Sequence, residues 1–171
     1  MRTISGMALS PRRPPPVWLL MPAVLLAACA LPPPAPGTAE AELRRQWGAP
    51  TDTHALPGGG KRLEYATGPY GRSTWMIDLG PDARVQVAQQ VLTPERLFAL
   101  PAGALDRTAL RRELGRPGEV RGVHGGGETW YWRYETHDCL WLAASISAEG
   151  RFTGAAILPD PACDARSDGF D

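Results

Sequence analysis

The sequence predicts an α+β fold made of two tandem copies of one unit, each with short helices packed on a three-stranded antiparallel sheet. The first observation is an internal repeat. Three blocks recur at a constant shift of 67 residues, 43–50 as 110–117, 58–60 as 125–127, and Arg84 as Arg151. The others are a helical pattern at the start of each copy and strand-like alternation after it. One apolar face per sheet, covered by short helices, makes an α+β layer.

Each copy is expected to open with a short helix. A capping residue, two apolar residues four positions apart and a Gly-x-Pro stop mark both helices. These residues are Thr38, Leu43, Trp47, Gly48 and Pro50 in the first copy, and Asp106, Leu110, Leu114, Gly115 and Pro117 in the second. Thr93 and Pro94 predict a further helix ahead of the second copy. The first copy has a proline-rich segment at that place.

Three segments in each copy alternate apolar and polar residues, which is the period of a half-buried antiparallel strand. They are 63–65, 75–79 and 85–91 in the first copy, and 130–134, 140–146 and 152–158 in the second. Gly71, 80–82 and 148–150 mark turns. This parity places Trp130, Trp132, Tyr134, Leu140, Leu142 and Ile146 toward the helices. It places Tyr131, Arg133, Cys139 and Trp141 on the opposite face.

Residues 1–28 have the pattern of a removable export signal. Arg2, Arg12 and Arg13 precede an apolar run at 17–28, and the segment has no acidic residue. The run is too short to cross a membrane, which takes about 20 residues. Leu-Ala-Ala directly before Cys29 resembles the lipobox of bacterial lipoproteins, which implies cleavage before Cys29 and its acylation. The alternative, a buried cysteine in a short core helix, is disfavoured by the proline runs on both sides.

Residues 29–37 are therefore expected to be a lipidated cysteine followed by an extended, proline-rich tether. Ala30, in place of Asp, implies transfer to the outer membrane under the sorting rule known for enterobacterial lipoproteins. The sequence thus predicts a lipid-anchored protein of the outer membrane that faces the periplasm, with outer-membrane lipid as a partner.

Removal of the signal changes the charge balance and the cysteine count. The 18 basic residues lose three with the signal, which leaves 15 against 18 acidic residues, so the mature chain is weakly acidic. This balance argues against nucleic acid as a partner. With Cys29 assigned to lipid, Cys139 and Cys163 form an even pair that can persist as a disulfide in an oxidising periplasm. Two free thiols are the alternative.

A family resemblance rests on the second copy. A helix ending in Leu114-Gly115-Arg116-Pro117, a glycine-rich loop, the strand Trp130-Tyr131-Trp132 and two more strands are similar to small outer-membrane lipoproteins of the SmpA/OmlA group, with their BamE-like fold. The best match runs over 93–158, and the first copy matches without its leading helix. The resemblance implies one unit at 38–92, a second at 93–163 and a tail at 164–171.

What the resemblance implies for function is a non-catalytic scaffold or accessory of envelope and outer-membrane protein assembly. Its expected protein partner is the barrel-assembly machinery or a similar envelope protein. Tandem copies are also similar to the β-lactamase inhibitor protein, which implies an alternative role as a binder or inhibitor of a periplasmic enzyme.

The sequence predicts no catalytic residues, cofactor or metal ligands. His137, Asp138 and Cys139 are adjacent, so strand geometry points them to opposite faces and they cannot act as a triad. The glycine runs are not followed by Lys-Ser/Thr and do not open helices, so they are not phosphate loops. The cysteines and histidines lack metal-site spacing. A cell-wall or envelope-stress enzyme is the least favoured function.

Tyr131, Arg133 and Trp141 are the candidate protein-binding residues, because Trp, Tyr and Arg most often anchor interfaces. The alternative arrangement is that a Cys139–Cys163 disulfide draws residues 159–161 across the same face and covers Trp141.

Overall fold

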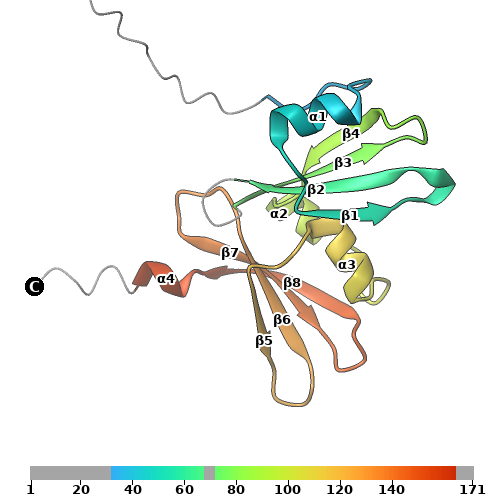
Figure 1. Cartoon of the computed structure of the whole chain (residues 1–171). Coiled ribbons are helices and arrows are strands. Elements are labelled where there is room, and N and C mark those ends of the chain that lie inside the picture. Colours follow the sequence, from blue (N-terminus) through green and yellow to red (C-terminus); the bar gives the residue numbers. More distant parts are fainter. Residues whose placement is uncertain (1–31, 68–71, 165–171) are drawn as a thin grey trace, which may run out of the picture. The chain divides into compact units, whose positions relative to one another are not determined.

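The computed structural model describes residues 32–67 and 72–164 (Figure 1). The expected signal at 1–28, the expected acylation site Cys29 and almost all of the predicted tail at 164–171 lie outside these residues, as does the start of the predicted tether. Within the described ranges, none of the helices has the length and apolar character needed to cross a bilayer.

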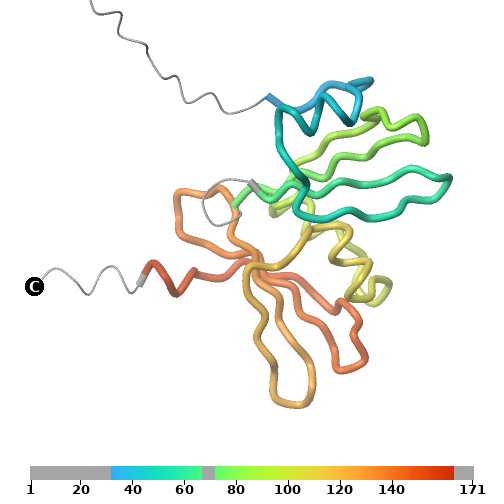
Figure 2. Tube along the Cα trace, viewed as in Figure 1, coloured from blue at the N-terminus to red at the C-terminus, as the bar shows by residue number. Residues whose placement is uncertain are grey.

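The first half of the described chain is one helix and a four-stranded sheet. Its elements are α1 (Glu40–Trp47), β1 (Asp52–Ala55), the 3-10 turn η1 (Pro57–Gly59), β2 (Lys61–Thr67), β3 (Ser73–Leu79) and β4 (Val85–Gln90). All neighbouring strands are antiparallel, in the order β1-β2-β3-β4, which we call sheet 1. The path is therefore a meander in which each strand pairs with the next along the chain (Figure 2).

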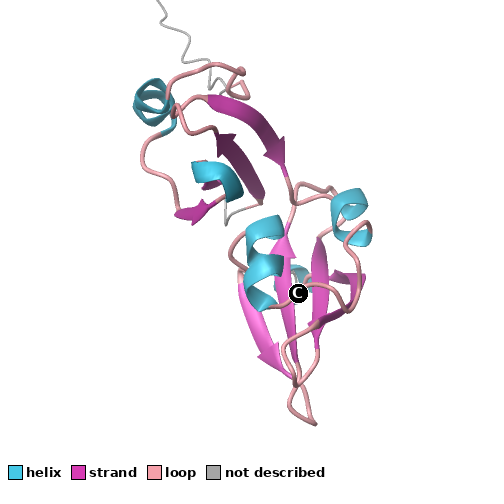
Figure 3. Ribbon diagram, turned by 90° about the vertical axis from the view of Figure 1, so that its right-hand side faces the viewer, coloured by secondary structure: helices cyan, strands magenta, loops and turns pink. Residues whose placement is uncertain are grey.

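The second half repeats this order and adds two short helices. Its elements are α2 (Pro94–Phe98), α3 (Arg107–Leu114), β5 (Glu119–Gly122), β6 (Glu128–Arg133), β7 (Leu140–Ile146), β8 (Phe152–Pro159) and α4 (Pro161–Asp164). The strands form an antiparallel sheet in the order β5-β6-β7-β8, which we call sheet 2. Helices lie beside both sheets in the turned view (Figure 3).

The fold is thus mixed α+β as expected, but the prediction of three strands per sheet is wrong, because each sheet has four. The missed strands are β1 and β5, which occupy corresponding edges. Each has only four residues, of sequence Asp-Thr-His-Ala and Glu-Val-Arg-Gly. Because an edge strand buries little of either face, these sequences lack the apolar alternation by which the other strands were recognised.

Two of the three expected helix caps are confirmed. The Asp106 carboxylate accepts the Ala109 N–H at 2.8 Å, and the Thr93 hydroxyl accepts the Arg96 N–H at 3.2 Å. The Thr38 cap is wrong, because its hydroxyl donates to the Ala35 carbonyl, and α1 begins after Ala39. The part of the first half that corresponds to α2, residues 27–31, lies outside the described residues.

The shift of 67 residues recurs in the contacts of the two halves. An isolated bridge joins Ala39 to Arg84, and its counterpart joins Asp106 to Arg151. The Tyr65 hydroxyl donates to the Gly48 carbonyl, and at the corresponding position the Trp132 indole donates to the Gly115 carbonyl, both at 3.2 Å. One partner of each contact belongs to a recurring sequence block, whereas the other partner lies outside the blocks, so the contacts extend the correspondence between the two halves beyond the blocks.

Each half has its own apolar core between its helices and one face of its sheet. The first core contains Leu43 of α1 with Leu63, Tyr65, Ile77, Leu79 and Val85. The second contains Leu97, Leu110 and Leu114 of the helices with Trp130, Trp132, Tyr134, Leu142, Ile146 and Phe152. The predicted helix-facing residues of the second half are therefore confirmed. We call the opposite side of each sheet its outer face.

Candidate functional site

The candidate residues gather on the outer face of sheet 2. Strand register places Arg133 opposite Trp141, and Trp141 opposite Leu158, so these three side chains form one row across β6, β7 and β8. The adjacent row begins with Glu119 of β5 and Tyr131 of β6. The rings of Tyr131 and Trp141 lie 4.9 Å apart between centroids and are tilted by 57°. The sheet thus brings the three predicted residues together.

Trp141 is covered by cationic side chains. The Arg121 guanidinium lies 5.2 Å from the Tyr131 ring centroid and 5.3 Å from that of Trp141, and the Arg133 guanidinium lies 5.4 Å from Trp141. These are cation–π distances. Trp141 is only 3% exposed, so of the two arrangements left open by the sequence the structure has the covered one.

The segment after β8 holds this cover in place. The Asp160 carboxylate binds Arg133 with an Nε–Oδ2 distance of 2.6 Å, and the Asp160 N–H donates to the Cys139 carbonyl. Burial raises the pKa of Asp160, but hydrogen bonds from Arg133 and the Ala162 N–H lower it more, so the carboxyl pKa lies below its ordinary value. Cys139 and Cys163 form a disulfide, with sulfurs 2.06 Å apart, that ties α4 to the β6–β7 loop.

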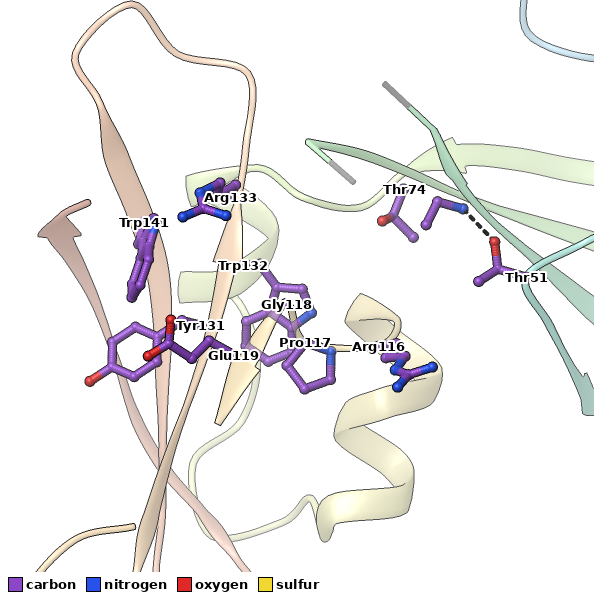
Figure 4. A pocket seen from close by; sticks show the side chains of 11 residues that line it. Thr51, Thr74, Arg116, Pro117, Gly118, Glu119, Tyr131, Trp132, Arg133 and Trp141 are labelled. Carbon is purple, nitrogen blue, oxygen red and sulfur yellow. Dashed lines mark hydrogen bonds between the residues drawn. The ribbon is translucent and has the colours of Figure 1, made fainter. Parts of the chain in front are cut away.

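A cavity of about 270 Å³ opens beside the aromatic pair, at the seam between the two sheets (Figure 4). Its wall has three parts: Thr51, Ala66 and Thr74 from the sheet 1 half, the connection from Arg116 to Glu119, and Tyr131, Trp132, Arg133 and Trp141 from sheet 2. Most of this wall is carbon, with guanidinium and carboxylate groups among it. We call this space the seam cavity.

The lining of the seam cavity combines aromatic rings with arginine side chains. Among the described residues that line it there is no cysteine, histidine or lysine, and its one carboxylate, Glu119, is ion-paired with Arg121. Aromatic rings next to arginines can contact an apolar segment and fix its polar ends. The site thus has the composition of an interface anchor.

The seam itself is formed by the outer face of sheet 1 and the C-terminal end of α3. Arg111 of α3 binds Asp52 at 2.7 Å, and Arg62 of β2 donates to the Arg112 carbonyl at 2.9 Å. Arg62 also pairs with Asp78 at 2.6 Å, which raises the pKa of the guanidinium above its ordinary value. Figure 1 shows α3 beside β1. Helix α3 therefore packs on its own sheet with one side and meets sheet 1 with its end.

Glu64 is the residue that sequence reasoning missed at this seam. Its side chain is 0% exposed, although carboxylates are seldom fully buried. One oxygen accepts the Arg116 N–H at 3.0 Å, and the other lies 3.3 Å from His54 Nε2. No periodicity signal could reveal this arrangement, because it requires β1 to pair with β2 and the second half to dock on the first.

Asp52, His54 and Glu64 are also the described residues whose arrangement could hold a metal ion, since their ligand atoms lie within 4.8 Å of one another. The sequence predicted no such group, because the ligands come from two strands. Asp52 is already neutralised by Arg111, so a metal would compete with a guanidinium for this carboxylate. We therefore describe the three residues as a polar network of the seam.

Comparison with known proteins does not assign a family. No family model matches the chain, and no curated protein matches its sequence. Two solved structures are similar in part. A DUF4309 family protein, YjgB, from Bacillus subtilis is 14% identical, with a TM-score of 0.30, over 72% of this chain and 79% of that one. An extracellular protein with an SCP domain from Bacillus anthracis is 10% identical, with a TM-score of 0.28, over 79% of this chain and 47% of that one.

The chain therefore spans about half the length of the second of these proteins. TM-scores of 0.30 and 0.28 are too low to carry the fold or function of either protein over to this chain.

Proposed function

We propose that the protein is a non-catalytic, lipid-anchored scaffold of the cell envelope, with two BamE-like units on an acylated Cys29. It faces the periplasm from the outer membrane and acts as an accessory of outer-membrane protein assembly. The observation that supports this proposal best is the seam cavity, because its aromatic and arginine lining has the chemistry of an interface anchor and lacks a nucleophile–base pair.

The physical role of the lipid is to confine the binding module to a surface. Confinement raises the effective concentration of partners that share the membrane, so a modest interface suffices for occupancy. This suits a cavity of about 270 Å³, which accommodates a few side chains of a partner rather than a large interface.

The anchor is tested through Cys29. In cells, the wild-type chain is expected in the outer-membrane fraction, with intact mass spectrometry showing a chain that begins at residue 29 and carries acyl groups. Cys29→Ala is expected to abolish acylation and leave the membrane fraction. Recovery of a lipid-free wild-type chain in that fraction would refute the anchor.

The binding role is tested by placing a photocrosslinking amino acid at position 131, inside the seam cavity, in cells that carry the full chain. Adducts with barrel-assembly proteins are the expected result. Adducts with a soluble periplasmic hydrolase alone would replace the scaffold by the inhibitor alternative. The same probe at Val87, on the outer face of sheet 1 and away from the cavity lining, is the matched control.

A further inference from the structure

The two outer faces are equivalent positions of a repeat, but among the described residues only the outer face of sheet 1 receives the end of the helix that opens a copy. The outer face of sheet 2 carries Asp160 and the segment after β8 at one side. On sheet 1, the turn after α3 sits against Glu64 and Thr74. A Cβ built at Gly115 would lie 3.0 Å from the Glu64 oxygen and 2.9 Å from the Thr74 methyl, and the next residue donates its N–H to Glu64. Arg111, one helical turn earlier, adds the ion pair to Asp52. This contact is a helix end seated on a sheet.

The shift of 67 residues identifies a second helix end and a second sheet that lack this contact within the described ranges. Helix α1 is the counterpart of α3, with Arg44 in place of Arg111 and Gly48 in place of Gly115. Arg44 is 41% exposed, and a Cβ at Gly48 would have nothing within 4 Å. Sheet 2 presents Glu119 in place of Asp52 and Tyr131 in place of Glu64.

These two surfaces complement one another in charge and in size. Arg44 and Glu119 preserve the charges of the Arg111–Asp52 pair, and each exchanges or shares a local partner on docking, because Arg44 pairs with Glu40 and Glu119 with Arg121. In the turn, Ala49 stands where the docked turn has Arg116, so the helix end is smaller. On the sheet, Tyr131 and Trp141, with arginine side chains over the Trp141 ring, stand where sheet 1 has Glu64 and Thr74, so the receiving face is bulkier. The loss of volume on one side is offset by the gain on the other, as a packed contact requires.

We propose that α1 of one copy docks on the outer face of sheet 2 of a second copy, and that the turn at Gly48 and Ala49 enters the seam cavity. The inference rests on the proposed function in using the same cavity, and it names the partner. Because helix end and sheet face are different surfaces, the contact is heterologous and passes from copy to copy. Copies held in one membrane surface would join through a weak contact into a row.

The test is a pair of charge reversals in the full chain, followed by sedimentation equilibrium in a density-matched detergent. Arg44→Glu would set two carboxylates against each other at the contact, and Glu119→Arg would set two guanidinium groups against each other. Each variant is therefore expected to associate at least about tenfold more weakly than wild type. In an equimolar mixture every contact between unlike copies joins opposite charges, so association returns to the wild-type level. Thermal melts establish that each variant is folded.

Arg45→Glu is the matched control, because it makes the same change on the same helix. The side chain of Arg45 is 74% exposed, and its counterpart Arg112 contributes only a carbonyl to the internal contact. This variant is expected to associate like wild type. Equal weakening by all three variants would indicate a general charge effect and overturn the proposal.

Two other results would also overturn the proposal. The first is a wild-type chain that remains a single copy up to about 1 mM, the concentration at which a contact of about 4 kcal/mol would be half occupied. The second is a mixture of the two variants that does not associate. Single copies whose position 131 still crosslinks to an envelope protein would leave the scaffold proposal standing. Association restored in the mixture, without envelope adducts or a lipid anchor, would support the self-contact and refute the scaffold.

Discussion

At the residue scale, the Trp141 ring is covered by charged side chains. Its ring lies under Arg121 and Arg133 and beside Tyr131, on the face that does not contain the apolar core of its half. Guanidinium groups can cover an aromatic face because they are weakly hydrated and planar. The residue therefore supports the wall of the seam cavity rather than projecting from it as an open anchor.

Trp141→Ala is expected to lower the free energy of unfolding by about 3 kcal/mol, as for other buried Trp truncations. Leu158→Ala, in the same row but 39% exposed, is the control and should cost less than about 1 kcal/mol. Urea unfolding of both variants measures the difference. A wild-type midpoint for Trp141→Ala would mean that the ring is not buried in solution.

The lowered pKa of Asp160 implies that the stability of the fold depends on pH. Its pKa is lower in the folded chain than in the unfolded chain, so its ionised form stabilises the fold above the unfolded pKa, and this contribution is lost as pH falls through the folded pKa. The stability difference between wild type and Asp160→Asn should therefore be constant near neutral pH and shrink below about pH 4. Melting curves from about pH 7 to about pH 2.5 measure it; a constant difference over this range would contradict the assignment.

At the element scale, the position directly before the second strand of each sheet requires glycine, because the backbone of the neighbouring strand leaves no room for a Cβ atom. A Cβ at Gly60 would lie 2.5 Å from the Leu79 carbonyl oxygen, and one at Gly127 would lie 2.7 Å from that of Ile146. Both oxygens belong to the neighbouring strand of the same sheet, which cannot shift without loss of pairing. The glycine runs seen in the sequence thus belong to hairpins.

Gly127→Ala is accordingly expected to destabilise the protein by about 1 to 3 kcal/mol through overpacking. Gly122→Ala, at the end of β5, is the matched control, because a Cβ there meets no atom within 4 Å. It should be neutral or slightly stabilising through the unfolded chain. Thermal melts of the two variants measure the difference in stability. Equal midpoints would contradict this prediction, because they would show that the backbone around Gly127 accommodates a Cβ atom without loss of stability.

At the scale of the whole molecule, the elements with strong periodicity could be predicted and those defined by tertiary contact could not. The segments 75–79 and 140–146 correspond to β3 and β7 within two residues, and the Asp106 and Thr93 caps follow from local chemistry. Strands β1 and β5 could not be predicted, because four mostly polar residues at an edge carry no periodicity signal.

The candidate site likewise has a part that the sequence could predict and a part that depends on tertiary contacts. Strand parity placed Tyr131, Arg133 and Trp141 on one face, because the side-chain period of a strand is two. It could not show that Arg121 covers Trp141, because Arg121 lies on β5, a strand that the sequence pattern does not predict. It also left open whether residues 159–161 cover the ring. Nor could it reveal the seam cavity, which requires sheet 1, the turn after α3 and sheet 2 to meet.

The most direct test of the seam cavity as the binding site is to fill it with a larger side chain. Ala66 lines it from β2, so Ala66→Trp should occupy the space, whereas Val87→Trp adds the same side chain to the outer face of sheet 1 away from the lining. The measurement is the yield of the adduct from the position 131 photoprobe in cells. We predict that Ala66→Trp abolishes the adduct while its melting temperature stays within a few degrees of wild type, and that Val87→Trp keeps it. An undiminished adduct in a folded Ala66→Trp chain would contradict the assignment of this cavity as the binding site.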